Sequence, residues 1–183
     1  MIMEMSYSFG QCSNGYVDIG FLGFAQIDKF GNVNTHLIGE SYHNYKARLT
    51  GSGGNNDLAS LTENMVLVGL QSKEKFVERV DFITSPGYLT GGNSRREAGL
   101  LGNGPKAVIS QVGSYDFDPV TKHMRVKTLN PNVPFELVQL ATGFELPKPE
   151  GEIQRTEMPS QEILQILRKD VDPRGVFTSI PGM

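Results

Sequence analysis

The chain has 183 residues, a usual length for one domain and enough to bury a hydrophobic core without disulfide bonds. Its formal net charge of −3 and pI near 5.6 argue against nucleic acid or an anionic membrane as the main partner. The lone cysteine, Cys12, suits a reducing compartment, and neither a signal peptide nor an apolar run of about 18 residues is visible, so we expect a cytoplasmic protein outside the membrane.

We expect one domain over 1–183, in which 1–15 form a poorly ordered leader and 160–183 a C-terminal helix and tail. Residues 16–26 alternate and then turn apolar, as a strand entering a buried sheet does, and a hairpin is expected from about 21 to 38. Residues 45–50 are a short extended piece that leads into a glycine loop and then a helix start.

The second half of the chain alternates strands with helices, which predicts an α/β fold with antiparallel hairpins mixed in. The elements expected there are strands at 65–70, 80–84 and 106–111, a hairpin at 115–128, and a helix at 134–141. The Gly-, Asn- and Arg-rich residues 87–104 predict a long loop. Ser160 can cap a last helix, whose inward residues would be Ile163, Leu164, Ile166 and Leu167.

The glycine loop is the first candidate site. Three glycines in four residues let the backbone take positive φ and come close to a ligand, and the free N–H groups at a helix start favour a phosphate, a carboxylate or an oxyanion. A tight strand-to-helix turn without a ligand explains the same glycines equally well. The loop is neither a Walker A motif nor a GxGxxG motif, so a nucleotide has little support. Its residues are Gly51, Ser52, Gly53 and Gly54.

Three segments together resemble the class I CoA-transferases, and most of all their B (beta) subunits of the glutaconate CoA-transferase type. They are QIDKFGNVN at 26–34, GSGGNNDLAS at 51–60 and VDFITSPG at 80–87, in the family's order and approximate spacing. The resemblance runs from about residue 20 to residue 177.

This resemblance implies an open three-layer α/β/α sandwich with a mixed sheet, shortened at its N-terminus, that works beside a homologous A-type subunit. It also implies that a glutamate carboxylate attacks an acyl-CoA and that CoA then passes to a free carboxylic or dicarboxylic acid. A coenzyme A thioester would be a substrate, with no tightly bound cofactor. The residues implied at the acyl-CoA and oxyanion loop are Gly51, Ser52, Gly53, Gly54, Ser85 and Gly87.

The chain departs from the family pattern at the nucleophile. In the family, the nucleophilic glutamate lies N-terminal to the 26–34 segment, whereas here Glu4 is the sole acid before Asp18 and has no matching context. We therefore expect the nucleophile to be missing from this chain. Glu63 falls after the glycine loop, and we expect it to be a solvated residue at a helix end.

Glu40 lies between the hairpin and the glycine loop, and is either a cleft-lining acid or a loop carboxylate near Lys46 or Arg48. Of the histidines, His43 is expected to be a hydrogen-bonded loop residue, and His36 and His123 lack the spacing of metal ligands, so no metal site is expected.

Two arginines, Arg95 and Arg96, lie within the long loop. They would either meet a phosphate of CoA or a substrate carboxylate, or be an exposed pair.

Three functions remain open on the sequence. The first is a CoA-transferase subunit. The second is a CoA-thioester or ring-opening hydrolase of the same fold whose catalytic carboxylate lies on a partner chain. The third is a non-catalytic partner subunit.

Overall fold

The structure is a computed structural model and describes residues 4–148 and 151–176 of the chain. The expected tail at 177–183 therefore lies outside the described residues. In chain order the elements are α1 (Met5–Ser13), β1 (Ile19–Leu22), β2 (Gln26–Ile27), β3 (Val33–Asn34), β4 (Leu37–Ser41), β5 (Asn44–Arg48), α2 (Asn55–Leu61), β6 (Asn64–Val68), α3 (Ser94–Glu97), β7 (Pro105–Ile109), β8 (Gly113–Phe117), β9 (Met124–Leu129), α4 (Phe135–Leu140), β10 (Gln154–Arg155), α5 (Gln161–Ile166) and the π-helical turn η1 (Leu167–Val171).

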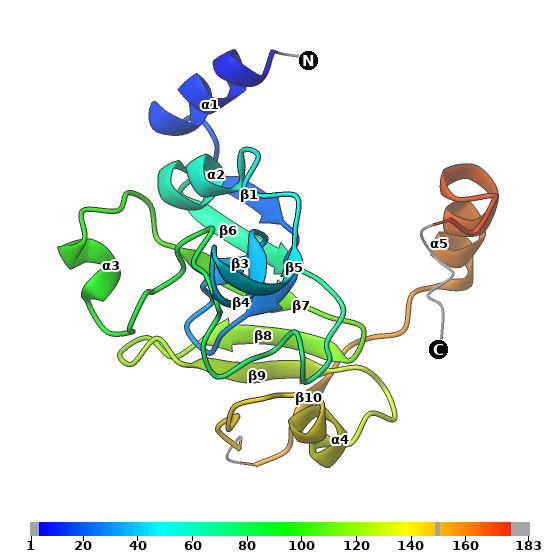
Figure 1. The fold of residues 1–183 in the computed structure, drawn as a ribbon. Coiled ribbons are helices and arrows are strands. Elements are labelled where there is room, and N and C mark those ends of the chain that lie inside the picture. Colours follow the sequence, from blue (N-terminus) through cyan, green and yellow to red (C-terminus); the bar gives the residue numbers. More distant parts are fainter. Residues whose placement is uncertain (1–3, 149–150, 177–183) are drawn as a thin grey trace.

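Six strands form the main sheet, in the order β1-β6-β7-β8-β9-β10 (Figure 1). Strands β1, β6 and β7 are parallel, with Phe21 opposite Val66 and Val66 opposite Ala107. Strand β8 is antiparallel to both β7 and β9, and β10 runs parallel to β9. The hairpins β2–β3 and β4–β5 form two small antiparallel sheets. The α/β fold with a mixed sheet and antiparallel hairpins, predicted from the sequence, is confirmed.

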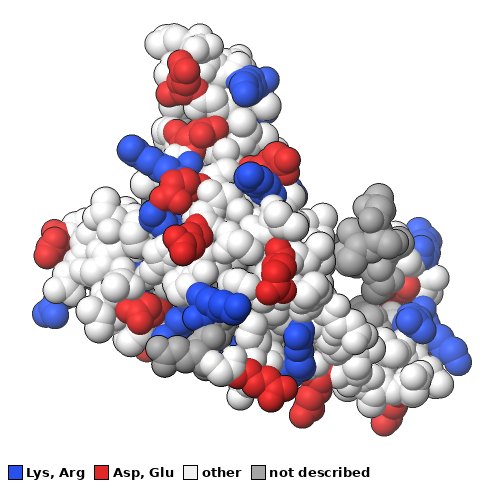
Figure 2. All heavy atoms as spheres, turned by 90° about the horizontal axis from the view of Figure 1, so that it is seen from below, with Lys and Arg blue, Asp and Glu red and all other residues white. Residues whose placement is uncertain are grey.

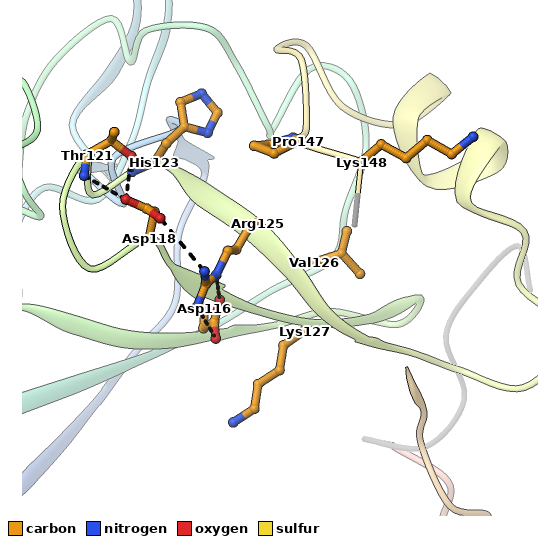
Figure 3. Close-up of a pocket in the computed structure, with 9 residues that line it drawn as sticks. All are labelled: Asp116, Asp118, Thr121, His123, Arg125, Val126, Lys127, Pro147 and Lys148. Carbon is orange, nitrogen blue, oxygen red and sulfur yellow. Dashed lines mark hydrogen bonds and ion pairs between the residues drawn. The ribbon is translucent and has the colours of Figure 1, made fainter. Parts of the chain in front are cut away.

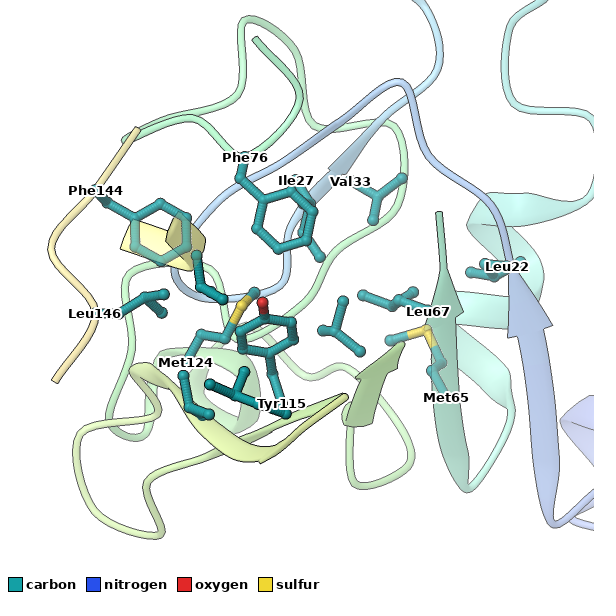
Figure 4. Packing of buried hydrophobic residues seen from close by; sticks show 14 of the residues in the cluster. Leu22, Ile27, Val33, Met65, Leu67, Phe76, Tyr115, Met124, Phe144 and Leu146 are labelled. Carbon is teal, nitrogen blue, oxygen red and sulfur yellow. The ribbon is translucent and has the colours of Figure 1, made fainter. Parts of the chain in front are cut away.

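One face of the main sheet carries the hydrophobic core (Figure 4). Side chains alternate between the two faces of a strand, so Met65 and Leu67 of β6 are both buried on this face. Phe76, from the segment after β6, is fully buried, and its ring centroid lies 5.7 Å from that of Phe24 and 5.8 Å from that of Tyr115. The core therefore joins the sheet to the long segment between β6 and β7.

The opposite face of the parallel strands carries exposed apolar side chains. Phe21 is 68% exposed, Ile19 and Val68 are each 45% exposed, and Ile109 is 43% exposed. The described residues thus leave this part of the sheet uncovered.

Helix α1 lies within the segment that we expected to be a leader, and it packs against α2 (Figure 1). Cys12 is its buried residue, and burial raises the pKa of the Cys12 thiol. The N-terminal helix thus extends the layer that α2 forms.

The prediction of a strand at 80–84 is wrong. This segment is irregular. It contacts the β2–β3 hairpin through hydrogen bonds from Thr84 N to Val33 O (2.8 Å) and between Asp81 and Gln26, and an isolated bridge joins Val33 to the next residue, Ser85. Strands β2 and β3 are two residues long each, so they offer too short an edge for a further strand to pair along.

The last helix begins where the sequence predicts, because Ser160 Oγ accepts a hydrogen bond from the backbone N–H of Ile163 (3.2 Å). The prediction that its apolar residues face inward is wrong. Helix α5 stands apart from the rest of the chain (Figure 1), and Ile163 and Ile166 are 57% and 48% exposed. No helix among the described residues combines the length and apolar character needed to cross a bilayer.

A polar network lies inside the core around Tyr115. The Tyr115 hydroxyl donates to Gln71 Oε1, Ser110 Oγ donates to the same oxygen (2.9 Å), and Gln71 Nε2 donates to Thr142 Oγ1 (2.9 Å). Burial raises the pKa of Tyr115 to about 12. The network joins β8 to the segment that follows β6.

We predict that Tyr115→Phe lowers the free energy of unfolding by about 1–2 kcal/mol at pH 8, because one hydrogen bond to Gln71 is lost. The raised pKa of Tyr115 means that the unfolded chain releases the phenol proton first, so this contribution is complete below pH 10 and is lost as the pH rises towards 12. Urea unfolding at several pH values should show the gap between wild type and variant closing over that range. Tyr16→Phe, at a 74% exposed position, is the control and should change nothing.

Candidate functional site

The glycine loop follows β5 and leads directly into α2. Gly51 and Gly53 have positive φ, at 93° and 48°, and a Cβ added at either would meet open space. The loop is fixed at its start by a pair of hydrogen bonds to Thr35: Gly51 N donates to Thr35 O (2.9 Å) and Thr35 Oγ1 donates to Gly51 O (2.8 Å). The backbone of Gly53 thus faces open space on a loop that is held at Gly51.

The last glycine of the loop is covered. A Cβ at Gly54 would collide with the ring of Phe9, which α1 carries. Helix α1 therefore packs directly on the point where the glycine loop becomes α2.

The second candidate segment, Ser85 to Gly87, is buried. Gly87 approaches the backbone of Gly31 so closely that a Cβ there would collide with it. Gly87 N donates to Asn32 Oδ1 (2.9 Å), and Ser85 and Val33 exchange two backbone hydrogen bonds of 3.0 and 3.1 Å. Ser85 Oγ is buried and makes no hydrogen bond within the described residues.

Thr84 and Thr35 bring the two candidate segments together. Thr84 Oγ1 accepts from Thr35 N (2.8 Å) and lies 3.0 Å from His36 Nδ1. Asn56, in the first turn of α2, donates from Nδ2 to Thr84 O (2.9 Å). The glycine loop, the start of α2 and the turn at Ser85 therefore form one hydrogen-bonded unit.

A hollow of about 600 Å³ adjoins this unit, lined by Ala25, Thr35, Arg48, Leu49 and Thr50. The Arg48 guanidinium lies over the ring of Tyr42, 4.7 Å from its centroid. The hollow thus opens beside the glycine loop with one cationic side chain in its lining, which suits an anionic ligand.

Both sequence interpretations of Arg95 are wrong. The side chain is only 5% exposed and forms no ion pair with an acid among the described residues: Nη1 donates to Pro86 O and Gly87 O (3.0 Å each), and Nη2 donates to Ala59 O (2.8 Å) and Leu101 O (2.6 Å). Burial lowers the pKa of Arg95. This guanidinium holds the turn at Ser85–Gly87 against α2, while its neighbour Arg96 is exposed.

Glu40 lies at the far end of the β4–β5 hairpin from Gly51. Its Oε2 accepts from Asn44 Nδ2 (2.9 Å) and the side chain is exposed, so the structure brings it to neither Lys46 nor Arg48 by hydrogen bond or ion pair among the described residues. His43, at the hairpin turn, donates its backbone N–H to Ser41 Oγ (3.3 Å).

Glu63 is exposed just after α2, as expected. Among the residues that the structure describes, no group of three or more His, Cys, Asp or Glu side chains could hold a metal ion.

Another hollow, of about 550 Å³, lies over the β8–β9 hairpin (Figure 3). Arg125 donates from Nε to Asp116 (2.7 Å) and lies 3.8 Å from Asp118. None of the residues that line this second hollow belongs to the glycine loop or to the Ser85–Gly87 turn. Acidic and basic side chains are interspersed on the face of the molecule that Figure 2 shows. We treat the hollow beside Gly51 as the candidate site because its lining residue Thr35 is bonded to both Gly51 and Thr84.

Sequence reasoning missed Thr35, Thr84 and Asn56, which connect the candidate segments. Hydroxyl and amide side chains of this kind carry no periodic signal, and their partners lie between 16 and 49 positions away along the chain. Only the position of Asn56, in the first turn of a helix after a glycine loop, hinted at a role.

A family model described as coenzyme A transferase matches residues 7–141. The B subunit of glutaconate CoA-transferase from Acidaminococcus fermentans is 37% identical over 164 residues, which are 89% of this chain and 60% of that protein. The B subunit of 3-oxoadipate CoA-transferase from Pseudomonas knackmussii is 37% identical over 154 residues, 84% of this chain and 58% of that one.

Among solved structures, glutaconate coenzyme A-transferase from A. fermentans superposes with a TM-score of 0.89 at 34% identity, covering 99% of this chain and 70% of that chain. The chain spans about three fifths of the length of these two B subunits.

We predict that Thr84→Val destabilises the fold by about 1–3 kcal/mol, because Thr35 N loses its buried acceptor. Amide hydrogen exchange should quicken at Thr35 and Gly51. Thr90→Val, at an exposed position in the same long segment, should stay within about 0.5 kcal/mol of wild type. Equal effects of the two variants would contradict the connection between the segments.

Arg95→Lys is expected to cost about 2–4 kcal/mol although it keeps the charge, because an ammonium group cannot reproduce the planar fork that reaches four carbonyls. The matched change Arg96→Lys, at the exposed neighbour, should be neutral. Thermal unfolding of the two variants side by side measures the difference.

Proposed function

Because the chain belongs to the coenzyme A transferase family, we propose that it supplies the acyl-CoA side of a CoA-transferase site, with an A-type subunit as partner. One observation carries the proposal: Thr35 and Thr84 join the glycine loop to the Ser85–Gly87 turn, beside a hollow lined by Arg48. The substrates are a coenzyme A thioester and a free carboxylic acid, without a tightly bound cofactor, and the lone Cys12 suits the cytoplasm.

The loop's contribution is electrostatic. When a carboxylate attacks a thioester, negative charge develops on the former carbonyl oxygen, and backbone N–H groups held in place before the reaction stabilise it. Gly53 has no side chain to block such an approach, and its surroundings are open. Holding the loop at Gly51 and the turn at Gly87 fixes these donors, so little reorganisation is needed as the charge forms.

Arg48 serves the anionic parts of the substrates. Its guanidinium is held over Tyr42 at the edge of the hollow, where it can meet a carboxylate or a CoA phosphate. In this proposal the attacking glutamate is missing from this chain and comes from a partner. Among the described residues no glutamate lines the hollow, and Glu40 and Glu63 are exposed away from it.

The test is CoA exchange measured after co-expression of the chain with an A-type subunit. Formation of the second acyl-CoA should require the acceptor acid. Gly53→Asp should lower kcat/KM for the acyl-CoA roughly tenfold or more, because a carboxylate then faces the developing negative charge.

Gly92→Asp is the matched control, since Gly92 has a similar φ of 53°, an equally open Cβ position and a place outside the candidate site. Release of CoA without any acceptor acid would favour a hydrolase instead. Association with the A-type subunit without turnover would favour a non-catalytic partner. Equal activity of Gly53→Asp and Gly92→Asp would remove the glycine loop from the site.

A further inference from the structure

The imidazole of His36 contacts the hydrogen-bonded unit that joins the glycine loop to the Ser85–Gly87 turn. Its Nδ1 lies 3.0 Å from Thr84 Oγ1. The backbone of His36 is held on both sides, because its N donates to Asn34 Oδ1 (2.9 Å) and its O accepts from Leu49 N (2.8 Å). Histidine is the side chain whose charge ordinarily changes between pH 5 and 8, so this contact can make the unit sensitive to pH.

The hydrogen bonds around Thr84 assign the proton of this contact. Thr84 Oγ1 accepts from Thr35 N (2.8 Å), and that donor cannot take the hydroxyl proton. Thr84 is 2% exposed, and the described residues offer its hydroxyl no acceptor other than His36 Nδ1. Because buried hydroxyls are ordinarily satisfied, Nδ1 is the acceptor, and the ring is neutral with its proton on Nε2.

Two aromatic side chains hold the plane of the imidazole. Its centroid lies 4.6 Å from that of Phe82, with the planes tilted by 38°, and 6.5 Å from that of Tyr42, with the planes at 75°. Phe82 and Tyr42 also meet edge to face, with centroids 5.7 Å apart. The ring of His36 is therefore packed in the plane in which Nδ1 meets Thr84 Oγ1.

No acid stabilises a charged His36 in this position. The ring forms no ion pair within the part of the chain that the structure describes. Asp81, next to Phe82, accepts hydrogen bonds of 2.8 and 3.1 Å from a backbone and a side-chain amide instead. The charge that contacts Tyr42 is the cation of Arg48, 4.7 Å from the ring centroid. Protonation of His36 thus gains no carboxylate partner.

A proton on Nδ1 would turn the acceptor of this contact into a donor. Two hydrogens would then lie between Nδ1 and Thr84 Oγ1, and the Thr84 hydroxyl would have to turn away and stay buried without an acceptor, which is unfavourable. The same oxygen holds Thr35 N, and Thr35 in turn exchanges hydrogen bonds with Gly51. A change at His36 is therefore passed to the glycine loop through Thr84 and Thr35.

We propose that neutral His36 is a positioning residue for the glycine loop: it orients the Thr84 hydroxyl so that its oxygen accepts from Thr35 N, and its protonation loosens the loop. His36 acts through Thr84 and touches neither the substrate nor the reacting atoms. The consequence for turnover rests on the function proposed above, whereas the hydrogen bond and its pH dependence are measurable on the chain alone.

The first test is the position of the imidazole proton in the wild-type chain. Long-range 1H–15N spectra of the full chain with labelled histidine, recorded near pH 7.5, should show an unprotonated Nδ1 and a protonated Nε2 for His36. The signals of His36 are identified by their loss in His36→Asn. A proton on Nδ1 at that pH, in a neutral or a charged ring, would overturn the proposal.

Two variants separate the hydrogen bond from the packing of the ring. His36→Asn keeps an acceptor near the position of Nδ1 but cannot be charged, and His36→Phe keeps a ring but has no acceptor. Between about pH 7.5 and 5.5, amide-exchange protection factors at Thr35 and Gly51 should fall about tenfold in wild type and stay constant in His36→Asn. In His36→Phe they should be low throughout.

His43→Asn, at the exposed turn of the β4–β5 hairpin, is the matched control and should keep the wild-type response to pH. The proposal is overturned if His36→Phe is as well protected as wild type near pH 7.5, or if His36→Asn retains the response.

CoA exchange by the complex with an A-type subunit connects this role to turnover. Over the same pH range, kcat/KM should fall about tenfold more in wild type than in His36→Asn. An equal fall in both would overturn the positioning role. Absence of turnover at every pH, with the expected protection factors, would contradict the proposed function and leave the role of His36 in holding the loop supported.

Discussion

Hydrogen bonds from side chains to backbone, together with isolated backbone bridges to β2 and β3, position the long segment between β6 and β7. Asn32 is the clearest instance: it is 1% exposed, its Oδ1 accepts from Gly87 N and Leu89 N, and its Nδ2 donates to Asp28 and to Leu89 O. A buried amide satisfied in this way fixes two pieces of chain relative to each other. Asn32 thus holds the turn at Ser85–Gly87 alongside the backbone hydrogen bonds between Ser85 and Val33.

The same arrangement explains why a buried guanidinium is tolerated without a carboxylate. Three of the four carbonyl groups around Arg95, those of Pro86, Gly87 and Leu101, lie outside strands and helices, and the fourth, that of Ala59, lies in the last turn of α2, where carbonyls lack partners within the helix. Each needs a donor, and one planar cation supplies all of them. Burial of the charge is offset by satisfying backbone groups that would otherwise be buried unpaired. The candidate site thus rests on a polar core as well as on the hydrophobic one.

Much of the fold could be predicted from the sequence where an apolar or alternating run is bounded by turn-forming residues. Strand β6, the hairpin β8–β9 and helix α4 follow from apolar runs bounded by Gly, Pro or Asp. The segment 80–84 has the same alternation, but no neighbouring strand offers it an edge to pair with. Whether such an edge is present depends on the tertiary structure and cannot be read from the local sequence pattern. The apolar stripe of α5 predicts a helix correctly, yet the stripe alone cannot say what the helix packs on.

For the site, the glycines at 51 and 53, which take positive φ, made the loop predictable, whereas the threonines that join it to Ser85 depend on contacts across the fold. The three glycines are also not equivalent. The ring of Phe9 fills the space that a Cβ at position 54 would need. Glycine at this position is therefore required for the packing of α1, whatever the ligand. An engineer seeking a different ligand preference should therefore vary Ser52 and Gly53 and leave position 54 unchanged.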